Sequence, residues 1–224
     1  MRTSAVGDVT ILLPDLDPAD LDPTTDLNDN LNDNLSDTLV ENASWRSAVL
    51  DDVPVRGSRI VGTDLSESVW EAGSLFGCEI VRTDFSGASL SGVAVERCVV
   101  TGSRFTGARL TDLRLKDVLF EGCRFDYATF TRVAATGAVA FVDCILTDAT
   151  WSSCRLPKVV LRSCRLDRLE LESCQLTGAD LRGNSFHDLK TTLGNLRGVT
   201  LSDEQLPDLT RLAVEELGLT IRGQ

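Results

Sequence analysis

A five-residue period runs through most of this 224-residue sequence and limits the folds that it can adopt. Large apolar residues recur at every fifth position from Trp45 to Phe186, with one additional residue between Ala135 and Phe141. They define 29 units, and 28 of these units have a large apolar residue at the centre. A period of five fits neither the α-helix nor the simple β-strand. It predicts short straight segments that are joined by regular turns.

The residues around each centre also follow a pattern. The residue two positions before the centre is small or compact, and eleven of the 17 glycines lie two positions after a centre. This pattern resembles the pentapeptide-repeat family, whose consensus is roughly Ala-(Asp/Asn)-Leu-X-X, and Ala108–Asp112 (ARLTD) and Ala179–Gly183 (ADLRG) match it well. The resemblance covers residues 43–188. It implies an all-β solenoid, a right-handed quadrilateral β-helix of about seven coils with four pentapeptides in each coil and a one-residue interruption near residues 136–138.

All seven cysteines lie two positions before a centre. They are Cys78, Cys98, Cys123, Cys144, Cys154, Cys164 and Cys174. Because a buried free cysteine behaves as a small apolar residue, we interpret them as core residues. A redox or metal role is the alternative, since cysteines 20 residues apart would stack in neighbouring coils.

Residues 1–42 precede the repeats and form an acidic arm or cap. The first 44 residues contain ten acidic residues and the single base Arg2. Leucines recur there at four-residue spacing among Asn and Asp, at positions Leu27, Leu31, Leu35 and Leu39. This spacing places the leucines on one helical stripe, but Asn and Asp are poor helix formers. The segment is therefore either a short amphipathic helix that caps the solenoid or a disordered acidic arm.

Residues 189–224 form a C-terminal helical module. Ser202–Gln205 has the pattern of a capping box, which begins a helix, and Gly218 suits its end. The apolar face of this helix consists of Leu206, Leu209, Leu212, Ala213 and Leu217. The arrangement is similar to the C-terminal module of mycobacterial gyrase-binding pentapeptide proteins, which implies a homodimer through the helix. The alternative is a helix that only caps a monomer.

In a quadrilateral coil every fourth pentapeptide lies on the same face, and we name each face after its first centre: Trp45, Leu50, Val55 or Ile60. The Leu50 face has a net charge of −4, and the opposite face, which begins at Val55, has a net charge of +4. The basic residues of the Val55 face are Arg56, Arg97, Arg114, Lys116, Arg155 and Lys158. The candidate partner-binding acids lie on the Leu50 and Trp45 faces and are Asp51, Asp52, Asp64, Glu67, Glu71, Asp84, Asp112, Glu170 and Glu172.

The Ile60 face is neutral and has an outward apolar stripe. Its members are Val61, Val81, Val99, Leu119, Val142 and Val160. An apolar stripe of this length on a solvent face indicates a packing site. We expect the N-terminal residues Ile11, Leu12 and Leu13 to cover it.

No catalytic constellation is visible in the sequence. His187 is the single histidine and lies beyond the last full repeat, so we expect no histidine-based metal cluster and no Ser-His or Cys-His nucleophile pair. We expect no enzyme activity, no metal and no cofactor. No apolar run is long enough to cross a bilayer, and the first ten residues lack a basic region followed by an apolar one, so we expect a soluble cytoplasmic protein.

The charge and the family resemblance together lead to two functional hypotheses. The net charge of −12 argues against direct nucleic-acid binding, which requires clustered Lys and Arg. The resemblance to the gyrase-binding branch implies a protein that mimics duplex DNA, binds DNA gyrase or a related type II topoisomerase, and protects it from poisons. The alternative is a general protein-interaction scaffold with an unknown partner.

Overall fold

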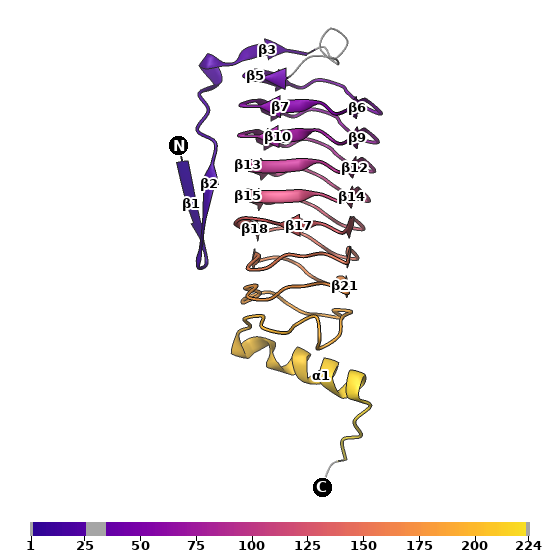
Figure 1. Cartoon of the computed structure of the whole chain (residues 1–224). Helices are drawn as coiled ribbons and strands as arrows, with labels where there is room; N and C mark the ends of the chain where they lie inside the picture. The colour runs from indigo at the N-terminus through magenta and orange to yellow at the C-terminus, as the bar shows by residue number, and fades with distance from the viewer. Residues whose placement is uncertain (1, 26–34, 223–224) are drawn as a thin grey trace.

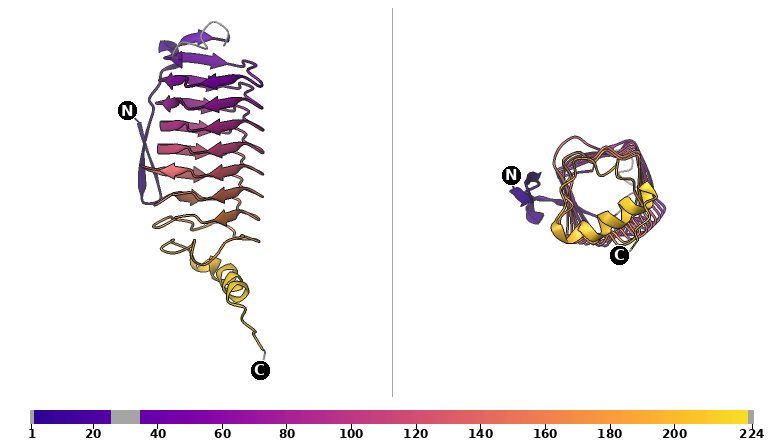
Figure 2. Two further views of the ribbon diagram at one scale, coloured as in Figure 1. Left: turned by 45° about the vertical axis from the view of Figure 1, so that its right-hand side comes forward. Right: turned by 90° about the horizontal axis from the view of Figure 1, so that it is seen from below.

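The computed structural model describes residues 2–25 and 35–222. Strands stack coil upon coil into a rod, with the N-terminal strands beside it and one helix at its lower end (Figure 1). Seen along its axis the coil is roughly four-sided (Figure 2). The five-residue period is therefore confirmed as a β-solenoid of about seven coils with a short C-terminal helix. Within the described ranges, no helix has the length and apolar character that crossing a bilayer requires.

Two parallel sheets form three of the four faces. The Leu50 face is a seven-stranded sheet of β6 (Val49–Asp51), β9 (Val69–Glu71), β12 (Ser89–Ser91), β14 (Arg109–Thr111), β16 (Thr129–Thr131), β19 (Thr150–Ser152) and β21 (Glu170–Glu172). The Val55 and Ile60 faces share a 12-stranded sheet of β3 (Asp22–Thr24), β4 (Leu35–Ser36), β5 (Thr38–Glu41), β7 (Pro54–Arg56), β8 (Arg59–Val61), β10 (Ser74–Phe76), β11 (Glu79–Val81), β13 (Ala94–Thr101), β15 (Arg114–Glu121), β17 (Ala134–Ala135), β18 (Val139–Val142) and β20 (Val160–Arg162). The Trp45 face is joined by isolated bridges, such as the one between Ser44 and Asp64.

Equivalent residues of neighbouring coils lie on top of each other. Leu90 pairs with Leu110, a separation of 20 residues in the sequence. Phe120 pairs instead with Phe141, because the chain has one additional residue between β17 and β18. The interruption expected near residues 136–138 is thus accommodated at one corner, and stacking continues on both sides of it.

The side chains at the repeat centres fill the interior of the rod. The rings of Phe85, Phe105 and Phe125 stack with centroids 4.8 Å apart from one coil to the next. Such aromatic pairs contribute about 0.5–1.5 kcal/mol beyond the area that they bury. An interior cavity lined by Trp70, Phe105 and other centres has a volume of only about 40 Å³. The interior is therefore a packed core.

The cysteines belong to this core, as the sequence predicts. All seven are buried and unpaired. Each thiol donates a hydrogen bond to a backbone carbonyl oxygen, as Cys123 does to Val100 at 3.3 Å. Neighbouring coils stack cysteine on cysteine, and the Cys78 N–H donates to the Sγ atom of Cys98 at 3.4 Å.

We expect all seven thiols to be unreactive in the folded protein. All seven side chains are buried, so a reagent in solution has no access to their sulfur atoms. In native buffer, Ellman's reagent should release almost no chromophore. In denaturant it should detect all seven thiols. Fast reaction of one or more thiols without denaturant would contradict the packing described here.

The C-terminal helix closes the lower end of the solenoid. A 3-10 turn, η2 (Asp203–Gln205), leads into α1 (Leu206–Leu217). The Ser202 N–H donates to Oε1 of Gln205 at 2.8 Å, as in the expected capping box. Gly218 ends the helix with a left-handed backbone at φ +61°, where glycine is favoured. The helix and both of its predicted boundaries are confirmed.

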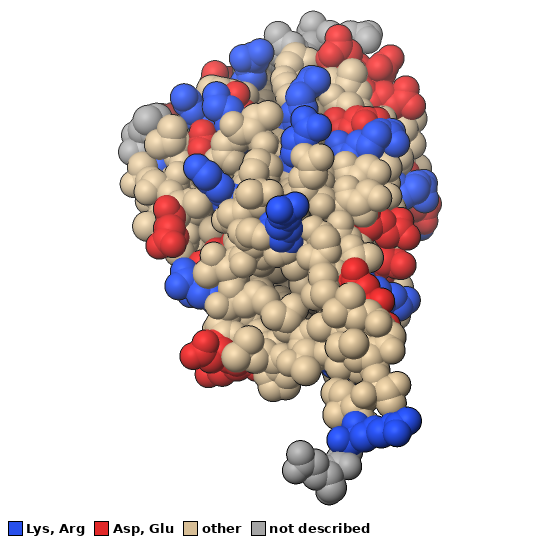
Figure 3. Space-filling model, turned by 60° about the horizontal axis from the view of Figure 1, so that its bottom comes forward, with Lys and Arg blue, Asp and Glu red and all other residues tan. Residues whose placement is uncertain are grey.

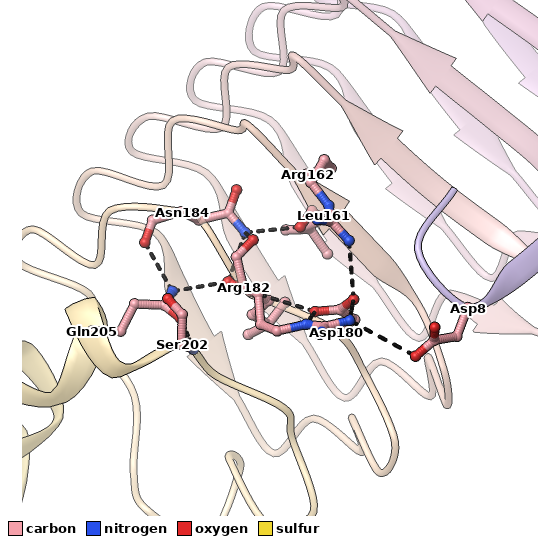
Figure 4. A network of polar contacts seen from close by, with 9 residues as sticks. Asp8, Leu161, Arg162, Asp180, Arg182, Asn184, Ser202 and Gln205 are labelled. Carbon is pink, nitrogen blue, oxygen red and sulfur yellow. Dashed lines mark hydrogen bonds and ion pairs between the residues drawn. The ribbon is translucent and has the colours of Figure 1, made fainter. Parts of the chain in front are cut away.

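Two buried amides satisfy the backbone of the last coils (Figure 4). Nδ2 of Asn184 donates to the carbonyl oxygens of Leu161 and Leu181, both at 2.8 Å. Nε2 of Gln205 donates to the carbonyl oxygens of Leu181 and Asn184, also at 2.8 Å. These amides satisfy the buried carbonyl groups of Leu161, Leu181 and Asn184 at the end of the ladder, as the cysteine thiols satisfy carbonyl groups in earlier coils.

The N-terminus forms a hairpin that the sequence analysis does not predict. β1 (Arg2–Val6) and β2 (Val9–Leu13) pair antiparallel and lie against the Ile60 face (Figure 2). Ile11 and Leu13 are buried there, in a cluster with Val99, Leu119, Ala140 and Val160. The expectation that N-terminal residues cover the apolar stripe is confirmed for Ile11 and Leu13. It is wrong for Leu12, which points away because side chains alternate along a strand.

Residues 14–24 then lead back along the rod to its upper end, where β3 pairs with β5. Leu35 and Leu39 lie in β4 and β5 and pair with Val55 and Arg59. Both alternatives given for this segment, a capping helix and a disordered arm, are therefore wrong for these two leucines, which lie in paired strands. Their spacing of four reflects strand positions in an incomplete first coil. Leu27 and Leu31 of the same stripe lie outside the described residues.

An ion network joins the hairpin turn to the last coils (Figure 4). Asp180 is almost buried and accepts hydrogen bonds from Arg162 at 3.2 Å and from Arg182 at 2.8 Å. Arg182 also lies 3.7 Å from Asp8, which is in the turn of the hairpin and is exposed to solvent. The Arg182 guanidinium holds the pKa of Asp180 below its usual value.

We expect this network to make stability depend on pH. A carboxyl group whose pKa is lowered by folding stabilises the folded state above its unfolded pKa of about 3.9, and this contribution is lost as the pH falls through the folded pKa. Asp180→Asn should therefore be less stable than the parent protein at neutral pH, and the two should converge in acid. Urea denaturation at neutral pH and at about pH 3 measures the difference. An equal difference at both values would contradict this assignment.

Candidate functional site

The acidic and basic faces share an edge of the rod. Successive pentapeptides occupy successive faces, so β6 on the Leu50 face is followed by β7 on the Val55 face, with Asp52 and Val53 at the corner. The expectation that these two faces are opposite is therefore wrong. The face opposite the Leu50 face is the Ile60 face, which the hairpin covers. Figure 3 shows acidic side chains along one border and basic ones gathered beside them on the front of the molecule.

Five of the nine candidate acids form no ion pair with any other described residue. They are Asp51, Asp52, Glu71, Glu170 and Glu172. Three of them lie on the first coils of the Leu50 face, and two lie on β21, its last strand. β9 and β21 are five strands apart in the sheet, which places the two groups about 24 Å apart at the usual strand spacing of ~4.8 Å. The face thus presents two separated anionic clusters.

The remaining four candidate acids are already held by neighbours. The contacts are Asp112 with Arg132, Asp84 with Arg104, Glu67 with Arg46, and Asp64 with Ser66. Asp112 and Arg132 form two parallel hydrogen bonds of 2.7 Å, and this pairing lowers the pKa of Asp112. The pKa of Asp64 is lowered by hydrogen bonds from the Ser66 side chain and N–H. These four carboxylates are less available to a partner than the five unpaired ones.

Hydroxyl groups occupy the middle of the Leu50 face. They belong to Ser89, Ser91, Thr111, Thr129, Thr131, Thr150 and Ser152, which point outward from β12, β14, β16 and β19. Arg109 is the charged residue on these strands, and it is exposed. The sheet therefore offers a flat polar surface between the two anionic clusters.

The predicted dimerisation residues divide into two groups. Leu209 and Leu212 pack against the last coil and contribute to the cap. Leu206 and Leu217 remain 53% and 61% exposed, and Ala213 is partly buried. The exposed leucines lie about three turns apart on one face of α1. A groove of about 530 Å³ lies between α1 and the last coil and is lined by Leu209, Leu212, Asp188, Arg211 and others.

Two further patterns in the sequence predict features of this structure, namely the ion pairs between neighbouring coils and the N-terminal hairpin. An acid and a base 20 residues apart meet across neighbouring coils, as in the pairs of Asp84 with Arg104 and Asp112 with Arg132. That spacing follows directly from four pentapeptides per coil. The hairpin could have been predicted because Gly7–Asp8, a favoured two-residue turn, lies between the apolar runs that end at Val6 and begin at Val9.

The arrangement suits binding by charge and shape. Among the described residues, no three His, Cys, Asp or Glu side chains lie where they could together hold a metal ion. The acidic clusters lie on a rigid sheet whose strands are fixed by stacking, so their spacing is set by the coil repeat and not by loops.

Comparisons with known proteins agree with the repeat architecture. The family described as "Pentapeptide repeats" matches in eight copies, at residues 103–139 and 144–183. No curated protein matches the chain. Among solved structures, HetL, a pentapeptide repeat protein involved in heterocyst differentiation regulation in the cyanobacterium Nostoc sp. strain PCC 7120, is 19% identical. The match covers 75% of this chain and 83% of that chain, with a TM-score of 0.46.

Two further solved structures show weaker similarity. QnrB1, a plasmid-mediated fluoroquinolone resistance protein, is 18% identical over 90% of this chain and 97% of that chain, with a TM-score of 0.40. A pentapeptide repeat protein from the Arabidopsis thaliana thylakoid lumen is 17% identical over 67% and 73%, with a TM-score of 0.20. The first stretch of the family match includes the inserted residue, and the stacked coils extend beyond both stretches, from Leu35 to Lys190. Two stretches of this chain, residues 103–139 and 144–183, therefore match the pentapeptide-repeat family.

Proposed function

We propose that this protein is a non-catalytic binding rod whose Leu50 face docks into a basic groove of a protein partner. The observation that carries the proposal is the presence of five acidic side chains without ion pairs, in two clusters at the ends of one flat face. Each cluster offers carboxylates that need not break an existing pair before they bind Lys or Arg. Fixed carboxylates on a rigid surface lose little conformational entropy on binding.

The basic groove that we propose as the partner is the one in which a type II topoisomerase such as DNA gyrase holds duplex DNA. A rod with anionic clusters along one side resembles a duplex in shape and in the sign of its charge, and the family resemblance in the sequence supports this choice. Bound there, the protein would compete with DNA and protect the enzyme from poisons that act on the DNA complex. The coarser alternative is a scaffold for a different protein partner.

Gyrase supercoiling, titrated with this protein in the presence and absence of a quinolone, tests the proposal. We expect either inhibition or protection at micromolar concentration. Asp51→Asn/Glu71→Gln should weaken the effect about tenfold or more, since each lost charge contact contributes about 1 kcal/mol or more. Glu96→Gln/Asp117→Asn on the Val55 face is the control, because it changes the net charge equally. No effect of the parent protein, or equal effects of the two double variants, would refute the gyrase proposal.

We further propose that two copies associate through the exposed side of α1. Leu206 and Leu217 are large apolar side chains left in solvent on the same helical face, which favours burial against a second copy. Light scattering after gel filtration should give a dimer mass for the parent protein and a monomer mass for Leu206→Glu/Leu217→Glu. A monomer mass for the parent protein at tens of micromolar would refute this association.

A further inference from the structure

The Val55 face carries a concentration of basic side chains that the proposed function does not use. Seven basic and two acidic residues point outward from it, since Arg197 joins the six bases named from the sequence. Figure 3 shows blue side chains gathered over the upper middle of the molecule, which is the front of Figure 1, where β7, β10, β15 and β17 lie. The exposed bases on this face that form no ion pair with any described residue are Arg56, Arg114, Arg155, Lys158 and Arg197.

Four basic side chains of this face lie within three successive coils and form a group that we call the Arg114 patch: Arg114, Lys116, Arg155 and Lys158. Arg114 and Arg155 lie in the same column of the sheet, two coils apart, with Ala134 between them. The coil spacing separates their backbones by about 10 Å. Lys116 follows Arg114 on the same side of β15 and is paired with Glu96 at 2.9 Å.

The inserted residue of the chain lies inside this patch. β17 ends at Ala135, and Thr136 and Gly137 occupy the corner beside Lys116. A Cβ atom on Gly137 would lie 2.7 Å from Cγ of Lys116, so a side chain at that position would displace the lysine. The surface between Arg114 and Arg155 therefore consists of small residues, and the longer basic side chains project on both sides of it.

We propose that the Arg114 patch binds an acidic, extended segment of a protein partner. In an extended strand, side chains two and four residues apart lie on the same face, about 7 and 13 Å apart, and the two-coil separation of about 10 Å between Arg114 and Arg155 lies between these values, within reach of the long Glu and Arg side chains. An acidic segment that runs along the rod axis can therefore place one carboxylate at each arginine. Both arginines can form two parallel hydrogen bonds with a carboxylate.

A protein segment fits this surface better than a nucleic acid does. The chain has a net charge of −12, and the acidic Leu50 face shares an edge with the Val55 face. A long polyanion laid on the patch would extend past its ends and toward carboxylates such as Asp52 at the shared corner. A short acidic segment remains within about one Debye length, ~10 Å at 0.1 M salt, of the four bases and is screened from the distant acids.

Fluorescence anisotropy with a labelled peptide in which Glu alternates with Ser tests the proposal. We expect saturable binding at low salt that weakens about tenfold or more between about 0.05 and 0.3 M salt. Arg114→Glu/Arg155→Glu should weaken binding about tenfold or more, whereas Arg114→Lys/Arg155→Lys should keep most of it. Arg46→Glu/Arg109→Glu is the matched control, because it lowers the net charge equally on the other faces and should change the affinity less than twofold.

Three outcomes would overturn the proposal. They are no binding by the parent protein, equal weakening in the patch variant and the net-charge control, and tighter binding of a DNA duplex than of the peptide under the same conditions. The patch variant should also retain the effect of the parent protein on gyrase supercoiling. The two surfaces are therefore tested independently, and failure of one proposal does not decide the other.

Discussion

Replacing Leu110 with Asp is expected to unfold the coils around β14. Leu110 is a repeat centre that is 3% exposed and stacks between Leu90 and Phe130 in the neighbouring coils. Loss of a buried leucine side chain costs about 2–5 kcal/mol, and a buried carboxylate without a partner adds several kcal/mol. The sum is comparable to the whole free energy of unfolding of an ordinary domain, about 5–15 kcal/mol.

Arg109→Asp is the matched control for this substitution. Arg109 precedes Leu110 on the same strand but points outward and is exposed. We expect the Leu110→Asp protein to lose most of its β-sheet circular-dichroism signal or to accumulate in inclusion bodies, and the Arg109→Asp protein to resemble the parent. A native spectrum and an unchanged melting temperature for Leu110→Asp would show that the register of the repeat is wrong.

Replacing Ile11 with Asp is expected to release the N-terminal hairpin while leaving the solenoid folded. Ile11 is fully buried against the Ile60 face, and a two-stranded hairpin is marginally stable without such packing. A carboxylate in this cluster costs several kcal/mol, which exceeds what the exposed contact of Asp8 with Arg182 can supply. Val99, Leu119 and Val160 would then be exposed to solvent.

Dye binding and limited proteolysis measure this release. ANS fluorescence should rise severalfold in Ile11→Asp because a continuous apolar stripe becomes accessible, and trypsin should cleave after Arg2 and at other basic sites on the Ile60 face more quickly. Thr10→Asp, on the exposed side of the same strand, should change neither signal. Unchanged dye binding in Ile11→Asp would mean that the hairpin does not protect the stripe.

The sequence predicted the solenoid well because one physical requirement repeats in every unit. Each pentapeptide must place one large and one small side chain inside the coil. The register of a unit that departs from this pattern can therefore be assigned from the regular units on both sides of it. Phe125 and Cys123 are examples, and both are fully buried where the register places them. The additional residue before Phe141 was visible for the same reason, because it shifts every later centre by one position.

The sequence does not predict features that depend on contacts outside the five-residue period. The hairpin lies on residues that are distant in sequence, and only its turn at Gly7 has a local signal. Leu35 and Leu39 have a spacing that suits a helix, but backbone pairing with β7 and β8 overrides it. The candidate acids on the Leu50 face were found by position alone. Some of them form ion pairs with arginines in adjacent coils, as Asp112 does with Arg132, and only the structure shows which acids remain without such a pair.

The position of the hairpin also bears on the order in which the chain can fold during synthesis. Each coil contacts only the coil before it, so the solenoid can grow as the chain leaves the ribosome. The first strands, however, pack on Val160, so the earliest residues to be made need a surface that is completed about 150 residues later, a delay of roughly 10–30 s at ordinary rates of translation. Val99 and Leu119 are made earlier in this interval, but the apolar cluster around Ile11 and Leu13 is complete only when Ala140 and Val160 have been added. The step that completes the packing of the hairpin therefore joins segments about 150 residues apart, and contacts of such long sequence separation form slowly.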